Sequence, residues 1–170
     1  MISKTILGAS LAVVFLTIMM APVFAAESWQ HKNSSSVTPL NSVVTRVTVV
    51  AADNIPQQTS VLGGFAWFYG DGPNTVFVAV THKGVQDSTQ NPNGWHTHNV
   101  QLAVGTSSGS DACITGLGPD TFAGTSINGK TINVNVRNSE LTGTLTGGAV
   151  AFTIVPDAGC AVTGLGVNLS

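Results

Sequence analysis

Three of the four histidines fall where two neighbouring strands would bring their side chains together. His96 and His98 stand two apart in the stretch 96–104, and residues two apart in a strand point to the same face. His82 ends the preceding stretch, 75–82, on the face that also carries its valines. Because consecutive strands usually pair, an antiparallel pairing predicts that His82 lies across from His96 or His98.

Three clustered imidazoles would provide the ligand set of an open copper or zinc site. Side chains opposite each other on paired strands lie about 5 Å apart, so three neutral rings can reach one ion. We expect Asp87 in the connecting loop to add an oxygen ligand, and His31 could add a fourth nitrogen. The affinity order of divalent metals favours copper, and tetrahedral geometry favours zinc. The alternative is that the histidines are polar caps on the core, bonded to backbone carbonyls or water.

The segment Gly94-Trp95-His96-Thr97-His98 resembles the Gly-Phe-His-x-His strand of the copper/zinc superoxide dismutases, which are β-sandwiches. Those enzymes also join a cysteine just past this strand to one near the C-terminus, as Cys113 and Cys160 could do. No histidine follows His98, so the other metal-binding histidines of that family have no counterparts, and neither does its substrate-guiding arginine. The resemblance implies a sandwich with a remnant or rebuilt copper site and does not extend to dismutase activity. No residue is predicted to be catalytic.

Residues 1–25 have the pattern of a secretory signal peptide, expected to be helical. Lys4 gives a positive start, residues 6–20 are an uncharged and mainly apolar run, Pro22 ends it, and small residues precede a cleavage site after Ala25. The alternative is an uncleaved membrane anchor, because residues 6–26 carry no charge and are long enough to span a bilayer, which takes about 20 residues. We therefore expect a secreted or extracytoplasmic protein, in a periplasm or at a cell surface.

Cys113 and Cys160 are the only cysteines. In an exported protein an even pair of cysteines indicates a disulfide. The alternative is two free, buried thiols. A joint metal site is disfavoured because the two cysteines lie far apart and not in a Cys-x-x-Cys spacing.

The rest of the chain shows strand patterns and no amphipathic helix. Residues 26–40 are polar and are expected to form a flexible lead-in. We expect a single all-β domain over 41–170, an antiparallel β-sandwich of about seven to eight strands with an immunoglobulin-like or superoxide-dismutase-like Greek key. Its strands are predicted at 43–51, 64–69, 75–82, 96–104, 127–137 (with a turn at Asn128-Gly129), 149–155 and 161–169.

Charge is scarce in this chain of 170 residues. Six basic and eight acidic residues give a net charge of −2, with no basic patch, which argues against nucleic acid as a partner. A surface of uncharged polar residues leaves strand edges poorly guarded against pairing. The second functional hypothesis is therefore a structural or adhesive protein that binds copies of itself or cell-surface proteins through strand edges, without a metal.

Overall fold

The computed structural model describes residues 26–82, 88–89, 91, 94–105 and 107–170. The predicted signal-peptide helix and Asp87 lie outside the described residues. The described chain is all-β, with two antiparallel sheets and two single-turn 3₁₀ helices, η1 (Ser28–Gln30) and η2 (Asn138–Glu140). No helix in this part of the chain is long and apolar enough to span a membrane.

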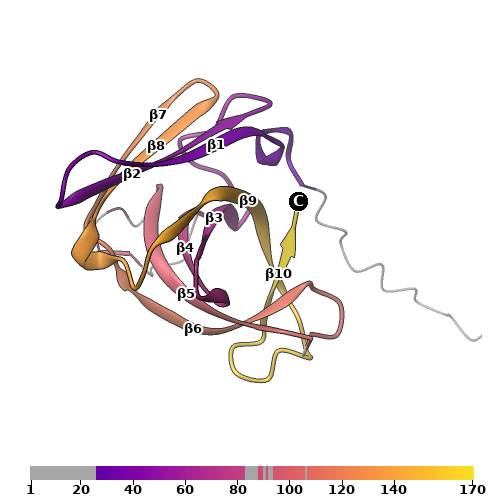
Figure 1. The fold of residues 1–170 in the computed structure, drawn as a ribbon. Coiled ribbons are helices and arrows are strands. Elements are labelled where there is room, and N and C mark those ends of the chain that lie inside the picture. Colours follow the sequence, from indigo (N-terminus) through magenta and orange to yellow (C-terminus); the bar gives the residue numbers. More distant parts are fainter. Residues whose placement is uncertain (1–25, 83–87, 90, 92–93, 106) are drawn as a thin grey trace, which may run out of the picture.

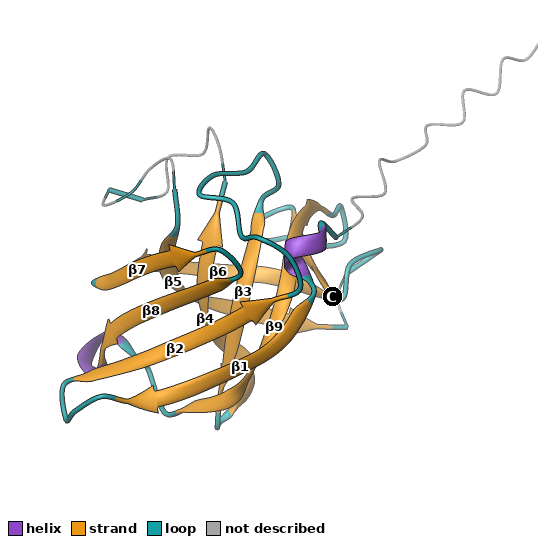
Figure 2. Ribbon diagram, turned by 90° about the horizontal axis from the view of Figure 1, so that it is seen from above, coloured by secondary structure: helices purple, strands orange, loops and turns teal. Residues whose placement is uncertain are grey.

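Sheet A has four strands in the order β1 (Lys32–Pro39), β2 (Val44–Ala51), β8 (Thr131–Arg137) and β7 (Ala123–Asn128). Its two central strands alternate strictly between buried and partly exposed residues, so each presents one apolar face. The buried positions are fully covered and include Val47, Val49, Ile132 and Val134. This face is turned toward the second sheet (Figure 2).

The second sheet closes on itself and is called the barrel below. Its strands are β3 (Gly63–Tyr69), β4 (Gly72–Thr81), β5 (His96–Val104), β6 (Ala112–Asp120), β9 (Leu145–Pro156) and β10 (Leu165–Leu169). They follow the order β10-β6-β5-β4-β3-β9, and β10 also pairs with β9, which completes the ring (Figure 1).

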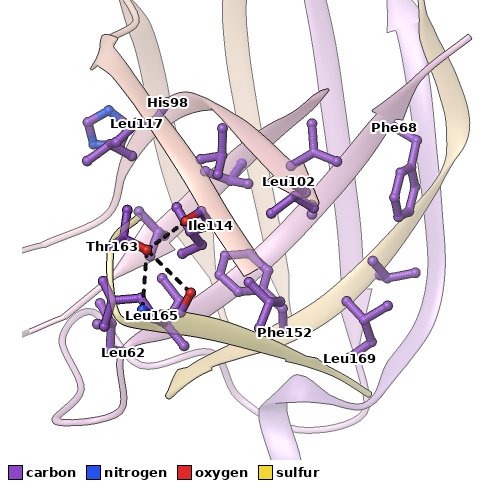
Figure 3. A pocket seen from close by; sticks show the side chains of 18 residues that line it. Leu62, Phe68, His98, Leu102, Ile114, Leu117, Phe152, Thr163, Leu165 and Leu169 are labelled. Atoms are coloured by element: carbon purple, nitrogen blue, oxygen red, sulfur yellow. Dashed lines mark hydrogen bonds between the residues drawn. The ribbon is translucent and has the colours of Figure 1, made fainter. Parts of the chain in front are cut away.

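The barrel wall separates two hydrophobic cores. On β3 and β4, Phe65, Trp67 and Phe77 point outward into the core shared with sheet A. The alternating residues Ala66 and Val78 point into the barrel, where β5, β6, β9 and β10 add further aliphatic and aromatic side chains (Figure 3). Both faces of these strands are therefore apolar, which explains why their sequences are hydrophobic almost throughout.

The all-β sandwich architecture and its disulfide are confirmed. Two antiparallel sheets face each other, and Cys113 on β6 is bonded to Cys160 in the β9–β10 connection, with their Cα atoms 5.2 Å apart. The described residues contain ten strands. Two of them, β1 and β6, were not predicted, and the predicted stretch 127–137 forms two strands, β7 and β8, separated by its turn.

The expectation of a flexible lead-in over residues 26–40 is wrong. Residues 32–39 form β1, which pairs with β2 from Lys32↔Ala51 to Pro39↔Thr45. The preceding Trp29 and Gln30 are almost completely buried. This polar segment is ordered because β2 provides partners for its backbone hydrogen bonds and because its own Trp29 and Gln30 are buried in the folded domain.

Candidate metal centre

Two adjacent barrel strands position the three histidines as the sequence predicts. β4 and β5 are antiparallel, with Val80 opposite His96 and Val78 opposite His98. His82 directly follows β4 and therefore lies beside the start of β5. All three side chains are buried, with 1–5% of their surface exposed.

The three imidazoles form a continuous contact, called the histidine cluster below. The ring centroids of His82 and His96 are 4.8 Å apart, and those of His96 and His98 are 5.1 Å apart. Both pairs meet edge to face, with interplanar angles of 78° and 86°. The spacing agrees with the distance expected between side chains on paired strands.

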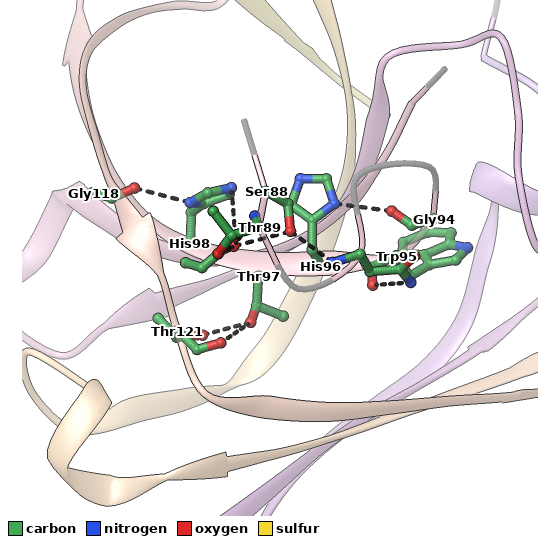
Figure 4. Close-up of polar contacts among 11 residues, drawn as sticks. Ser88, Thr89, Gly94, Trp95, His96, Thr97, His98, Gly118 and Thr121 are labelled. Atoms are coloured by element: carbon green, nitrogen blue, oxygen red, sulfur yellow. Dashed lines mark hydrogen bonds and ion pairs between the residues drawn. The ribbon is translucent and has the colours of Figure 1, made fainter. Parts of the chain in front are cut away.

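Backbone carbonyls orient two of these rings. His96 Nδ1 lies 2.9 Å from Gly94 O, and His98 Nδ1 lies 2.9 Å from Gly118 O (Figure 4). A carbonyl only accepts hydrogen bonds, so each Nδ1 carries the proton. In the neutral ring Nε2 is then the nitrogen with an electron pair, which is how metal-binding histidines are commonly held.

Asp120 brings a carboxylate to the cluster. It ends β6 directly opposite His98 in the strand register, and its Oδ1 lies 3.5 Å from His98 Nε2. Its other oxygen, Oδ2, accepts hydrogen bonds from Ser88 Oγ (3.0 Å), Thr89 N (2.8 Å) and Thr89 Oγ1 (3.3 Å). Asp120 therefore links the β4–β5 connection to the end of β6 at the histidine cluster.

Trp95 fixes the start of β5 from the opposite side. Its indole stacks on Phe65 and meets Trp29 edge to face in the core shared with sheet A. Its Nε1 donates a hydrogen bond of 2.8 Å to Pro56 O. Because Trp95 points outward, the adjacent His96 must point toward the barrel interior.

No family model, no curated protein and no solved structure matches this chain.

The other two predicted ligands have different outcomes. His31 is exposed, between η1 and β1, and no ring contact joins it to the other three histidines of the described chain. Asp87 lies outside the described residues, so its position relative to the cluster stays a prediction. Sequence reasoning missed Asp120 as a neighbour of His98 because it predicted no strand over residues 112–120.

The nitrogen and oxygen atoms of the cluster are of the types that bind transition metals, but their present positions do not form a metal site. Imidazole nitrogens and a carboxylate oxygen are ordinary ligands of zinc and copper. Among the described residues, however, no group of three or more His, Cys, Asp or Glu side chains could hold an ion as they stand. The cluster supplies the right atoms close together and would have to tighten around an ion.

Proposed function

We propose that the protein binds a divalent transition metal ion through His82, His96 and His98, with Asp120 as an oxygen ligand. The observation that carries the proposal is the contact of three buried imidazoles from two adjacent strands, with ring centroids 4.8 and 5.1 Å apart. A cluster of three rings in a buried position is far more specific to metal binding than one histidine in a core.

The spacing of His98 and Asp120 supports this proposal. Two ligand atoms that each lie about 2.1 Å from a tetrahedral ion are separated by about 3.4 Å. His98 Nε2 and Asp120 Oδ1 are 3.5 Å apart. This separation also suits a weak ion pair with a protonated ring, so a metal and a proton would compete for the same nitrogen.

Binding would require the side chains of the cluster to move toward one point. The Nδ1 hydrogen bonds of His96 and His98 already set the ring orientation from the backbone. Rotation of His82, which follows the strand rather than lying in it, could bring a third nitrogen toward the same point. A set of three nitrogens and one oxygen suits tetrahedral Zn(II) and also Cu(II), which has the higher intrinsic affinity.

Isothermal titration of the metal-free protein with Zn(II) or Cu(II) at neutral pH tests the proposal. We expect one ion per chain, with binding weakened by more than about 100-fold in His96→Ala and in His98→Ala, because even outer-shell partners are worth about 10–100-fold. Binding should also weaken on acidification, since the ligand nitrogens must be unprotonated.

His31→Ala is the matched control and should bind as the unmodified protein does, because this histidine is exposed and outside the cluster. Asp120→Asn and Asp87→Ala compare the two candidate oxygen ligands. Nitrogen hyperfine splitting in the electron paramagnetic resonance spectrum of the copper form would report imidazole ligation directly. The absence of uptake of either ion, or equal weakening by His31→Ala, would contradict the proposal.

A second candidate function, assembly through a strand edge, is favoured by β7. This strand forms one edge of sheet A, and none of its six residues is charged. The opposite edge, β1, is tied to β9 by Ser35, whose hydroxyl accepts a hydrogen bond of 2.9 Å from Ala149 N. An uncharged open edge is suited to pairing with a second chain.

Sedimentation velocity separates this candidate from the metal-binding one. Assembly through β7 predicts concentration-dependent self-association that is abolished by Ser126→Lys on that strand and retained in Ser60→Lys, an exposed loop position. A monomer at all concentrations, or equal effects of the two substitutions, would contradict self-assembly.

A further inference from the structure

The interior of the barrel contains a cavity of about 230 Å³. All six strands contribute to its wall, and the residues that line it are aliphatic or aromatic except for His98 and Thr163 (Figure 3). The cavity belongs to the inner core, on the other side of the barrel wall from sheet A. His98 joins it to the histidine cluster at one end.

A void of this size is unusual in a folded domain. Protein interiors are packed about as densely as organic crystals and contain few voids larger than a water molecule. An apolar void destabilises a protein in proportion to its volume, because the lining side chains lose their contacts. A barrel of only six strands could fill its interior with larger side chains than the valines and alanine at positions 66, 76, 78, 80 and 100. The small side chains therefore indicate that the barrel interior is a binding site and not a poorly packed core.

Water is a poor occupant of this space. A buried water molecule needs two to four polar partners. The Thr163 hydroxyl already donates a hydrogen bond of 2.6 Å to Ile114 O. The Nδ1 of His98 is bonded to Gly118 O, and its Nε2 lies 3.5 Å from Asp120 Oδ1. The remaining wall has no side-chain polar group, so a hydrocarbon occupies it at a lower free-energy cost than water does.

The barrel has an apolar rim where such a molecule could enter. Leu169, at the end of β10, is 45% exposed although it lines the cavity. Phe68 and Leu102 are only partly buried and also line the wall. Figure 3 places Phe68 and Leu169 at the end of the cavity away from His98. Leu117, which lies beside His98 in Figure 3, also lines the cavity and is 54% exposed. The cavity therefore has exposed apolar side chains at both ends and a histidine at one of them.

From these observations we infer that the barrel interior binds a small molecule with a hydrocarbon body of about ten carbon atoms. The size follows from comparison with an engineered protein cavity of about 150 Å³, which holds one benzene molecule. A medium-length acyl or alkyl chain and a branched, terpene-like skeleton share this chemistry. The inference is independent of the proposed metal site, because it rests on the aliphatic wall.

Titration calorimetry of metal-free protein with decan-1-ol, and separately with a ten-carbon terpene alcohol, tests the inference and distinguishes the two sources. We expect saturable one-to-one binding of at least one of them, and weaker binding of butan-1-ol and hexadecan-1-ol, which underfill or overfill the cavity. Nuclear Overhauser effects should connect the bound ligand to the methyl groups of Val78 and Val100, which line the wall.

Filling the cavity provides the decisive variant. Val100→Phe should reduce the affinity for the bound alcohol by at least about tenfold, because the ring would occupy the ligand's volume. Val162→Phe is the matched control, since Val162 is 71% exposed and is not part of the wall. Ala66→Leu, a smaller filling substitution, replaces Val100→Phe if circular dichroism shows that the latter does not fold.

Two results would overturn the inference. One is the absence of saturable binding of every alcohol tested. The other is equal affinity in the filled variant and the control, which would place any binding on the outer surface. Because the protein is metal-free, either result leaves the proposed metal site untouched, and failure of metal binding leaves this inference untouched.

Discussion

Asp157 gathers two loops of the barrel around one carboxylate. Its oxygens accept hydrogen bonds from the hydroxyls and backbone amides of Ser108 and Ser110 and from the amides of Gly109 and Gly159. The side chain is buried. The hydroxyls of Ser108 and Ser110 hold the pKa of Asp157 well below its ordinary value of 3.8, and the amides of Ser108 and Gly159 add to this effect.

This network predicts a stability change that depends on pH. The pKa of Asp157 is lower in the folded state than in the unfolded one, so its stabilisation is fully present above pH 3.8 and is lost as the pH falls toward the folded-state pKa. Asp157→Asn should therefore lower the melting temperature by several degrees at pH 7, and the difference from the unmodified protein should shrink in acid. Thermal unfolding followed by circular dichroism between pH 2 and about pH 7 measures both effects.

Asp71→Asn is the control for this prediction. Asp71 is an exposed carboxylate in the β3–β4 turn, and its substitution should leave the melting temperature nearly unchanged. A loss of stability in Asp157→Asn that stays constant down to the lowest pH would contradict the role given to the ionised carboxylate.

The strand pattern is sufficient to predict the histidine cluster. The cluster depends only on the strand face that each histidine occupies and on the pairing of β4 with β5. Alternation defines β5 with the observed ends, His96 and Val104, and places β4 within three residues of its ends. His96 and His98 then share a face, and the antiparallel register brings His82 beside them. The orientation of each ring is not predictable in this way, since it depends on the carbonyls of Gly94 and Gly118.

Two strands escape prediction because their pairing partners, rather than their own sequence patterns, specify them. β1 has one partner, β2, and its residues are mostly exposed and polar, so no apolar alternation marks it. β6 contains Gly116, Gly118 and Pro119, which local rules assign to turns. It is a strand because β5 and β10 pair with it from both sides, with register irregularities that accommodate the proline. Barrel closure, and with it the cavity, could not be predicted without β6.

Gln30 is the anchor that holds η1 and β1 on the domain. Its side chain is fully buried, and its Nε2 donates hydrogen bonds to Phe152 O (2.8 Å) and Thr153 Oγ1 (3.1 Å) on β9. A Cβ at Gly63 would lie 2.9 Å from this Nε2 and 2.5 Å from Phe152 O, so the close approach requires a glycine there. The anchor therefore joins the N-terminal segment to the wall of the barrel.

Gln30→Ala should reduce the free energy of unfolding by about 1–3 kcal/mol, because it leaves the buried carbonyl of Phe152 without this donor. Urea denaturation of the two proteins measures the difference. Gln57→Ala, at an exposed loop position, should change stability by less than about 0.5 kcal/mol. If both variants unfold at the same urea concentration, Gln30 does not anchor the segment.

At the scale of the whole molecule, the disulfide connects parts of the barrel that are far apart in the sequence. Cys113 and Cys160 are 47 residues apart, and Cys113 lies on β6 where that strand meets β10 to close the ring. The Asp157 network joins the same β9–β10 connection to the β5–β6 connection, which leads directly into the start of β6. Closure is thus reinforced by a covalent bond and by a buried carboxylate at one place.

The double variant Cys113→Ser/Cys160→Ser should lose about 4 kcal/mol of stability, because the unfolded chain gains the entropy of a 47-residue loop. Denaturant unfolding of the two proteins measures this loss. A reducing agent should destabilise the unmodified protein by a similar amount and have no effect on the double variant, which controls for other actions of the reagent. If the unmodified protein and the double variant are equally stable without a reducing agent, strand pairing and the Asp157 network are sufficient to close the barrel. In that case a further substitution, Asp157→Asn, should destabilise the double variant at pH 7 at least as much as it destabilises the unmodified protein, since the two loops would then be joined by hydrogen bonds, most of which end on the carboxylate.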